Sequence, residues 1–428
     1  MEKVRIAILG LGNVGTGVWK ILNTNKKEIK KRSGYHIEVA KILVRDKKKP
    51  RCVEVPEDIL TTDYNEILMD DSIKIVVELM GGVEPAKEYM LSAIRHNKHV
   101  VTANKFVLAT HGNELLDAAY AQGVMLYYEA SVAGGIPIIH GISESLTANK
   151  IVEILGIING TTNYILTKMS QEGMEFEEAL KEAQEKGYAE ADPTADIEAY
   201  DAMYKLAILG SLSFGSRVHV DSIYREGITS ISSVDIQYAR EFGYVIKLLA
   251  IGKERNGVLE LRVHPAMIPA NHPLANVNDS FNAIFIKGNA VGDLMLYGRG
   301  AGDLPTGSAV VGDIISVLRN GIDDIVPAEQ KDKLSNLRVQ SMDYTVCEYY
   351  IRCTVLDTPG TLGDIAAIFG KNNVSLASVI QKGKTGEQVP LVFITHQTTE
   401  KNISDAIEEV KKLSTVVKVE NIIRVEKI

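Results

Sequence analysis

Cysteine is scarce in this sequence, which has three among 428 residues: Cys52, Cys347 and Cys353. The number is odd, and no two cysteines have the spacing of a metal or redox motif. A disulfide framework is therefore excluded, and a reducing compartment is favoured. No cysteine lies between residues 53 and 346. Cys353 lies in a strand-like run, so we expect a small buried hydrophobic side chain there.

Long apolar runs are also missing, since no stretch of about 18 apolar residues occurs that could span a membrane. The first residues, MEKVRIAILG, lead directly into a strand and lack the pattern of a signal peptide. The net charge of −8 argues against a general nucleic-acid binder. We therefore expect a cytoplasmic protein, without a membrane or nucleic-acid partner, whose length requires two or three domains.

Glycine is placed distinctively near the start of the chain. A buried strand is expected over residues 4–9, and Gly10, Gly12 and Gly15 after it form the pattern G-x-G-x-x-G ahead of a helix. The first glycine permits a tight turn, the second lets a pyrophosphate approach the backbone, and the third lets helix and strand pack closely. The pyrophosphate would bind at the helix N-terminus, so Asn13 and Val14 join the predicted dinucleotide site.

The second predicted strand, residues 36–46, indicates which dinucleotide is preferred. A site that prefers NAD usually ends this strand with an acid that binds the ribose 2′-hydroxyl. Here Arg45 occupies that place, with three lysines at 47–49 close behind. Arginine suits a 2′-phosphate, so NADP(H) is favoured. Asp46 weakens this inference and keeps NAD(H) open.

Further strands are predicted within residues 73–82, 98–109 and 123–139, alternating with helices. This alternation predicts a doubly wound parallel sheet over roughly the first 130 residues. Ligands of such sheets bind beyond the carboxyl ends of the strands. Thr102 and Lys105 follow one of these ends, so we expect them beside the nicotinamide or its substrate.

The segment GYAEADPTADIEAYDAMYKLAILGSL, residues 187–212, places acids ahead of a long apolar run that holds one lysine. One helix is predicted, with Asp192 as N-cap and Pro193 in its first turn. Asp201 and Lys205 then stand one turn apart. A solvated i,i+4 pair of this kind contributes roughly 0.2–0.5 kcal/mol. The other interpretation is a functional site, in which the carboxylate holds a buried ammonium charged and oriented.

The rest of the chain predicts two further parts. Strands and helices after residue 140 indicate an α+β domain, which includes a glycine loop, 298–302, ahead of a helix. Residues 319–344 are polar and weakly periodic, as in a linker. The order beyond them is β-α-β-β-α-β, a ferredoxin-like arrangement with no cluster of residues fit for catalysis. We therefore expect a regulatory or oligomerisation module.

Several motifs together resemble those of homoserine dehydrogenases, and the resemblance covers essentially the whole chain. The motifs are TANK, YYEASVAGGIPII, GTTNYI, GRGAG with PTGSAVVGD after it, and GYAEADPTADIEAYDAMYKLAIL. The tail resembles an ACT domain, whose role is to bind amino-acid effectors. The resemblance implies the layout of the monofunctional enzyme: a Rossmann domain over 1–135 completed by about 306–320, a catalytic and dimerisation domain over 136–305, a linker over 321–345 and an ACT domain over 346–428.

The same resemblance implies the reaction, the reversible reduction of L-aspartate 4-semialdehyde to L-homoserine with NAD(P)H, in threonine, methionine and isoleucine biosynthesis. By resemblance Lys205 is the proton donor and Lys105 orients the substrate. Also implied are substrate contacts at Glu190, Asp201, Thr161 and Tyr188, cofactor contacts that include Gly302, and a monovalent cation, usually sodium, at Glu129, Val132, Gly134 and Ile136. A homodimer or homotetramer with feedback by an amino acid, threonine first, is expected.

Two alternatives remain to be weighed. A phosphorylating semialdehyde or glyceraldehyde-type dehydrogenase also joins a Rossmann domain to an α+β domain, but it needs a thiolate nucleophile. The absence of cysteine from residues 53–346 counts strongly against it. A non-catalytic sensor of nucleotide and amino acid would not need Lys105, Glu190, Asp201 and Lys205 together. Oxidation of NADPH on adding aspartate semialdehyde separates the enzyme from the sensor.

Overall fold

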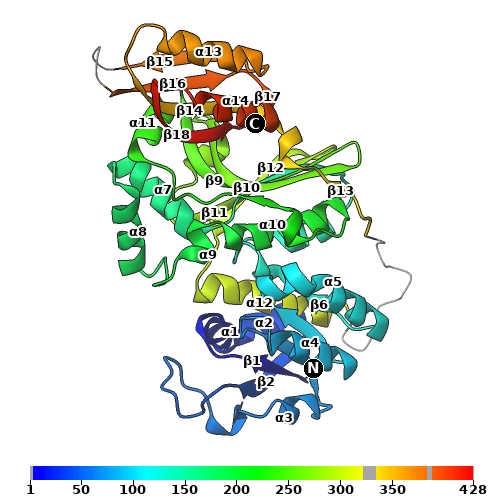
Figure 1. Cartoon of the computed structure of the whole chain (residues 1–428). Helices are drawn as coiled ribbons and strands as arrows, with labels where there is room; N and C mark the ends of the chain where they lie inside the picture. The colour runs from blue at the N-terminus through cyan, green and yellow to red at the C-terminus, as the bar shows by residue number, and fades with distance from the viewer. Residues whose placement is uncertain (1–2, 322–333, 383–387, 428) are drawn as a thin grey trace. The chain divides into compact units, whose positions relative to one another are not determined.

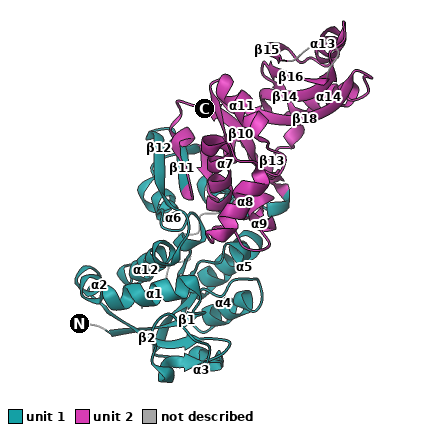
Figure 2. Cartoon of the chain, turned by 90° about the vertical axis from the view of Figure 1, so that its left-hand side faces the viewer, with its two compact units in different colours: residues 1–152, 204–221, 282–336 teal, residues 153–203, 222–281, 337–428 magenta. Residues whose placement is uncertain are grey.

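The structure of the chain, a computed structural model, describes residues 3–321, 334–382 and 388–427 (Figure 1). The chain divides into two compact units, each built from separate stretches of sequence (Figure 2). Unit 1 comprises 1–152, 204–221 and 282–336, and unit 2 comprises 153–203, 222–281 and 337–428. In the part of the chain that the structure describes, no helix has both the length and the apolar character needed to cross a membrane.

Unit 1 contains a six-stranded sheet in the order β3-β2-β1-β4-β5-β6. Every neighbouring pair in it is parallel. The order reverses between β1 and β4, which is the topological switch point of a doubly wound sheet. The predicted N-terminal fold is confirmed. The strands are β1 (Lys3–Leu9), β2 (His36–Leu43), β3 (Leu60–Thr61), β4 (Ile73–Glu78), β5 (His99–Thr102) and β6 (Leu126–Tyr127).

Helices cover both faces of this sheet. Alternate strand residues point to opposite sides, so each strand contributes to an apolar cluster on either face. Ile6 and Ile8 pack in one apolar cluster with residues of α1 (Asn13–Thr24) and α12 (Asp303–Arg319). Ala7 and Leu9 pack in a second cluster with residues of α4 (Ala86–Arg95) and α5 (Lys105–Gln122). The shorter helices of this part are α2 (Lys26–Ser33) and α3 (Asn65–Leu68).

Helix α12 packs directly on α1, although almost 280 residues separate them in the sequence. Gly17 permits the contact, since a Cβ there would lie 1.9 Å from the carbonyl oxygen of Asp303. The Nζ atom of Lys20 bonds the Asp303 carboxylate at 2.9 Å. Unit 1 also contains α6 (Ile138–His140) and a pair of strands, β11 (Phe281–Gly288) and β12 (Gly292–Arg299).

Unit 2 contains a sheet whose centre is the antiparallel pair β9 (Tyr244–Arg255) and β10 (Val258–Pro269). Strand β7 (Ile151–Ile157) pairs with β9, and β8 (Tyr224–Arg225) pairs with β10. The helices of this part are α7 (Gly160–Glu172), α8 (Phe176–Glu185), α9 (Thr194–Ile197) and α11 (Ser233–Glu241).

The C-terminal tail has the predicted β-α-β-β-α-β order, with strands arranged β18-β14-β16-β15. Only the short β17 (Thr398–Thr399) is added to the prediction. Residues 322–333 of the predicted linker lie outside the described residues, and β13 (Arg338–Val339) follows them. The tail elements are β14 (Val346–Leu356), α13 (Thr361–Lys371), β15 (Leu376–Gln381), β16 (Gln388–Thr395), α14 (Glu400–Val410) and β18 (Val416–Val425).

The tail is joined to the rest of unit 2 through its last strand and through a buried charge. Strand β18 runs parallel to β10 at Ala266 and Met267. The fully buried Asp235 of α11 accepts hydrogen bonds from Arg352 at 2.7 Å, from the Tyr350 hydroxyl at 2.9 Å and from Asn421 at 3.0 Å. These three donors belong to β14 and β18, so the tail's own sheet holds the start of α11.

Candidate active site

The glycine loop after β1 has an open position where a pyrophosphate would bind. Gly10 has φ +99°, and a Cβ there would lie 2.8 Å from the Leu79 oxygen. A Cβ at Gly15 would lie 2.2 Å from the Gly10 oxygen, whereas one at Gly12 would meet no atom within 4 Å. Protein packing thus requires glycine at 10 and 15 but not at 12. The space beside Gly12, at the start of α1, fits a pyrophosphate group.

Arg45 lies exposed just after β2, where the ribose of a dinucleotide is expected. Its guanidinium makes no hydrogen bond within the described residues. The neighbouring Asp46 is engaged, because its carboxylate accepts the Lys48 N–H at 2.8 Å and its carbonyl accepts from Arg51 at 2.6 Å. The arginine is available to a ligand, and the acid is held within its own loop.

A buried carboxylate that the sequence reasoning missed organises the turn after β5. Glu78, at the end of β4, accepts from the Thr102 hydroxyl at 2.6 Å and from the Met80 N–H at 2.8 Å. The same hydroxyl accepts the Asn104 N–H at 3.0 Å. Burial raises the pKa of Glu78. The side chain of Thr102 therefore holds the turn, and a cofactor contact at residue 102 would use its backbone.

The two predicted catalytic lysines belong to unit 1 and stand near the starts of two helices, α5 and α10 (Tyr200–Phe214). Lys105 is the first residue of α5, where Asn104 is the N-cap and accepts the Val107 N–H. The rings of the adjacent residues Phe106 and Tyr204 meet edge to face, with their centroids 4.7 Å apart. This contact holds the two helix starts together, so the backbones of both lysines lie close.

The helix that carries Lys205 is shorter than predicted. Residues 192–212 do not form one helix, because α9 ends at Ile197 and Ala199 has φ +63° before α10 begins. The N-cap of α9 is Pro193, and Asp192 instead accepts the Thr194 N–H at 3.1 Å. The predicted spacing of Asp201 and Lys205 survives, since both lie within α10.

Asp201 and Lys205 are buried, with exposed fractions of 6% and 8%. This burial contradicts the interpretation of a solvated surface pair. Asn159, which the sequence reasoning also missed, donates to Asp201 at 2.9 Å and to Asp196 at 2.6 Å. The other end of its carboxamide accepts the Thr162 N–H as the N-cap of α7. The carboxylate at 201 is therefore fixed from outside its own helix.

The remaining predicted substrate contacts lie in unit 2 and differ in whether their side chains already have a partner in the protein. The Thr161 hydroxyl donates to the Tyr188 carbonyl at 2.7 Å, and the Tyr188 ring packs on Tyr164 at 4.8 Å. Glu190 is exposed, and its carboxylate has no partner among the described residues. Thr161 thus supports the loop that carries Tyr188 and Glu190, and Glu190 offers a free charge to a ligand.

The turn predicted to bind a cation, residues 129–136, is shaped by buried hydrogen bonds. The Glu129 carboxylate accepts the N–H groups of Ile139 and His140 at 2.8 and 2.7 Å. Within the described residues, no hydrogen bond is accepted by the carbonyls of Val132 and Gly134. These two oxygens suit a hard cation, whereas the side chain of Glu129 is engaged in holding the turn.

His140 adds a charged group behind this turn. Its ring nitrogens bond Asp313 at 2.8 Å and Glu144 at 2.7 Å. The hydrogen bond to Asp313, followed by that to Glu144, raises the pKa of His140 to about 9 despite partial burial. At neutral pH the ring is therefore protonated, and its positive charge offsets that of nearby carboxylates in this part of unit 1.

Gly302, the last of the predicted cofactor contacts, is the N-cap of α12 with φ +121°. Helix α12 begins at Asp303, directly after the glycine loop. The Asp303 carboxylate accepts the Leu304 N–H at 2.8 Å, and Pro305 has no N–H, so this helix start is closed by its own first turn. The positive φ explains why glycine is needed at 302.

The comparisons with known proteins agree over the whole chain. Residues 137–315 match the family model of homoserine dehydrogenase, residues 10–129 match its NAD binding domain, and residues 349–415 match the ACT domain. A homoserine dehydrogenase from Synechocystis is 45% identical, with 99% of each chain covered. The crystal structure of a homoserine dehydrogenase from Thiobacillus denitrificans is 43% identical with a TM-score of 0.92, covering 99% of this chain and 98% of that one.

A more distant solved structure was determined with a ligand. It is a hyperthermophilic archaeal homoserine dehydrogenase in complex with NADPH, 28% identical with a TM-score of 0.62. The match covers 73% of this chain and 97% of that one. Together with the family models, these similarities show that the chain belongs to the homoserine dehydrogenases, oxidoreductases with an NAD-binding domain, here followed by an ACT domain.

Proposed function

We propose that the chain catalyses the reversible reduction of L-aspartate 4-semialdehyde to L-homoserine, with Lys205 as proton donor, in the cytoplasmic synthesis of threonine, methionine and isoleucine. The observation that supports this most is the burial of Lys205 one turn after Asp201, with its helix start held against that of Lys105 by the contact between Phe106 and Tyr204. Removing an ammonium from water is costly, and here the chain places the carboxylate of Asp201 one helical turn before it.

The bound nicotinamide supplies the hydride to the aldehyde carbon. The oxygen of that aldehyde gains negative charge as the hydride arrives, and the Lys205 ammonium transfers a proton to it, so the alcohol forms and the amine remains neutral. Lys105, also cationic, orients the substrate and stabilises the developing charge. Asp201, fixed by Asn159, keeps the ammonium of Lys205 in place. We assign the substrate's amino group to the free carboxylate of Glu190, with Thr161 and Tyr188 as supporting contacts.

The direct test is the oxidation of NADPH by the full chain on adding L-aspartate 4-semialdehyde, followed by identification of homoserine as the product. Turnover that depends on both reactants supports the dehydrogenase. Binding of NADPH without oxidation would instead favour the non-catalytic sensor. The phosphorylating rival lacks a nucleophile where it needs one, since no cysteine lies between residues 53 and 346 and burial raises the pKa of Cys347 and of Cys353 to about 12.

For the cofactor we propose a preference for NADPH, with NADH as the poorer substrate. The support is the exposed, unbonded Arg45 beside an aspartate that is already engaged. Arg45→Ala should raise KM for NADPH strongly and KM for NADH little, because only NADPH carries a 2′-phosphate. Arg95→Ala, an exposed arginine of α4, is the matched control. Equal effects of Arg45→Ala on the two cofactors would contradict the assignment.

A monovalent cation, sodium first, is proposed at the turn 129–136. Its ligands would be the backbone carbonyls of Glu129, Val132, Gly134 and Ile136, and the ion would brace the turn against the glycine loop at 300. No cluster of three His, Cys, Asp or Glu side chains suited to a metal occurs among the described residues, which fits an ion held by carbonyls. Thermal unfolding in sodium chloride and in choline chloride tests the site: equal melting temperatures would contradict it.

For regulation we propose that an amino acid, threonine first, binds the ACT tail of a dimeric or tetrameric enzyme. The buried contacts of Asp235 with Arg352 and Asn421 connect the tail to α11, so binding in the tail can act on this helix. Calorimetric titration of the full chain with threonine, isoleucine, methionine and serine tests the effector, and light scattering gives the assembly. If none of the four amino acids binds, the tail has a structural role only.

A further inference from the structure

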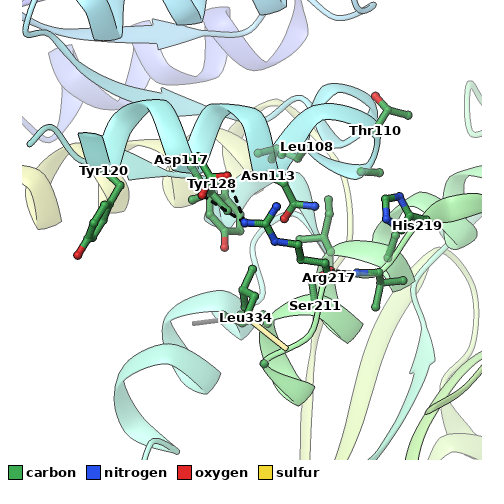
Figure 3. A pocket seen from close by; sticks show the side chains of 18 residues that line it. Leu108, Thr110, Asn113, Asp117, Tyr120, Tyr128, Ser211, Arg217, His219 and Leu334 are labelled. Atoms are coloured by element: carbon green, nitrogen blue, oxygen red, sulfur yellow. Dashed lines mark hydrogen bonds and ion pairs between the residues drawn. The ribbon is translucent and has the colours of Figure 1, made fainter. Parts of the chain in front are cut away.

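Unit 1 contains a cavity of about 550 Å³ that no part of the proposed reaction uses. It lies between α5 and α10, along the stretches Leu108–Tyr120 and Ala207–Leu212 that follow Lys105 and Lys205 (Figure 3). Much of the wall is apolar and comes from both helices and from the chain just after α10. Its larger members are Leu108, Leu116, Ile208, Leu212 and Val218. Cavities of roughly 300–1,000 Å³ with apolar walls and few polar groups are typical of small-molecule sites.

A pair of opposite charges lies at one side of this cavity. The Arg217 guanidinium faces the Asp117 carboxylate with distances of 3.2 and 3.5 Å (Figure 3). Charge-assisted hydrogen bonds are usually about 2.7–2.9 Å long, so this pair is loose. The side chains are 35% and 44% exposed, and water therefore screens their attraction. A ligand that carries both charges can offer Arg217 and Asp117 each a shorter hydrogen bond than they make with one another.

Two more polar groups face the cavity without protein partners. Neither the Asn113 carboxamide nor the Tyr128 hydroxyl makes a hydrogen bond within the described residues. Both point into the cavity near Arg217 and Asp117 (Figure 3). Burial raises the pKa of Tyr128 to about 12, so its hydroxyl remains a donor at neutral pH. Both residues are partly buried, and a ligand in the cavity can form hydrogen bonds with these groups.

We propose that this cavity binds a free α-amino acid with a bulky apolar side chain. Its carboxylate would pair with Arg217 and accept from Asn113 and Tyr128, its ammonium would pair with Asp117, and its side chain would pack on the apolar wall. An α-amino acid presents its two opposite charges close together, as the loose ion pair does. The site is separate from the ACT tail, which belongs to unit 2.

Occupancy of the cavity has a consequence for the two lysines. Helices α5 and α10 contact each other near their starts through Phe106 and Tyr204, and the Asp117–Arg217 pair lies at the far end of α5. A ligand that opens this pair changes the spacing of the helices that carry Lys105 and Lys205. We expect binding to alter activity, but binding itself requires no turnover and can be tested even if the proposed reaction is wrong.

The test is calorimetric titration of the full chain with leucine, methionine and phenylalanine, in the parent and in two variants. Gly112→Leu fills the cavity, and it should fold because a Cβ at Gly112 meets only the Leu108 Cβ at 3.9 Å. Gly312→Leu is the matched control, an exposed helical glycine of the same unit with no atom within 4 Å of its Cβ position. We expect Gly112→Leu to weaken binding at least about tenfold and Gly312→Leu to leave it unchanged.

A third variant, Arg217→Gln, isolates the charge. The parent should bind leucine at least about tenfold more tightly than leucinamide, which lacks the carboxylate, and Arg217→Gln should remove this preference. The proposal is overturned if none of the three amino acids binds the parent. It is equally overturned if Gly112→Leu binds them as tightly as Gly312→Leu does, since the ligand would then sit elsewhere, for example in the tail.

Discussion

In the glycine loop, the same substitution at two positions should affect different properties. Alanine at position 12 should weaken cofactor binding, and alanine at position 15 should lower stability. A Cβ at Gly12 meets no atom within 4 Å, so Gly12→Ala should fold. The added methyl group occupies the space expected for the pyrophosphate and separates it from the backbone N–H groups. Loss of one such hydrogen bond to a charged group costs about 1.5–3 kcal/mol, or about 10- to 150-fold in affinity for NADPH.

Gly15→Ala should instead act on the fold. Its Cβ would lie 2.2 Å from the backbone oxygen of Gly10, and neither backbone can move away cheaply. Overpacking of this kind typically costs about 1–3 kcal/mol. For a protein unit of this size the melting temperature should fall by about 2–12 °C. For Gly12→Ala we expect a change well below this.

The assays are thermal unfolding by circular dichroism and fluorescence titration with NADPH, applied to both variants and the parent. Weak binding with a parental melting temperature is the expected result for Gly12→Ala. An unchanged dissociation constant for that variant would show that the cofactor does not approach residue 12. A parental melting temperature for Gly15→Ala would show that the close contact of residues 10 and 15 is not what holds α1 to the sheet.

Three further predictions concern groups that hold the site and the tail. Asn159→Ala should lower kcat/KM about 10- to 150-fold, since Asp201 loses a hydrogen bond worth about 1.5–3 kcal/mol; an activity loss under about threefold in steady-state kinetics would contradict this. Arg352→Met leaves Asp235 buried without its cation, so the free energy of unfolding measured in urea should fall by about 3–5 kcal/mol. A fall below about 1 kcal/mol would contradict this. The pKa of His140 is raised from 6.5 to about 9. The stability that its charged form contributes is therefore complete below pH 6.5 and lost as the pH rises through 9. The stability difference between parent and His140→Gln should therefore shrink over that range, and a constant difference would exclude the charged imidazolium.

Much of the fold follows from the sequence because local and long-range signals agree. Strand β1, its glycine loop and the start of α1 are predicted by an apolar run, by glycine spacing and by helical periodicity together. The ferredoxin-like tail is predicted for the same reason, and its helices and strands occur in the predicted order. Each of these elements is specified by residues that are close together in the chain.

The parts that were missed depend on contacts between distant residues. The break at Ala199 has no sequence signal, since alanine rarely adopts positive φ and only its surroundings enforce it here. Glu78 and Thr102 are 24 positions apart, and Asn159 and Asp201 are 42 apart. An acid at the end of an apolar strand is a signal that could have identified Glu78. The cavity joins residues about 100 positions apart, so no local pattern could have revealed it.

The central claim is that the Lys205 ammonium protonates the substrate oxygen, and steady-state kinetics of Lys205→Met measure this most directly. A positioned acid contributes about 10²–10⁴-fold, so kcat should fall by that factor while NADPH affinity and melting temperature stay near those of the parent. A folded Lys205→Met variant that turns over within about threefold of the parent would contradict the mechanism.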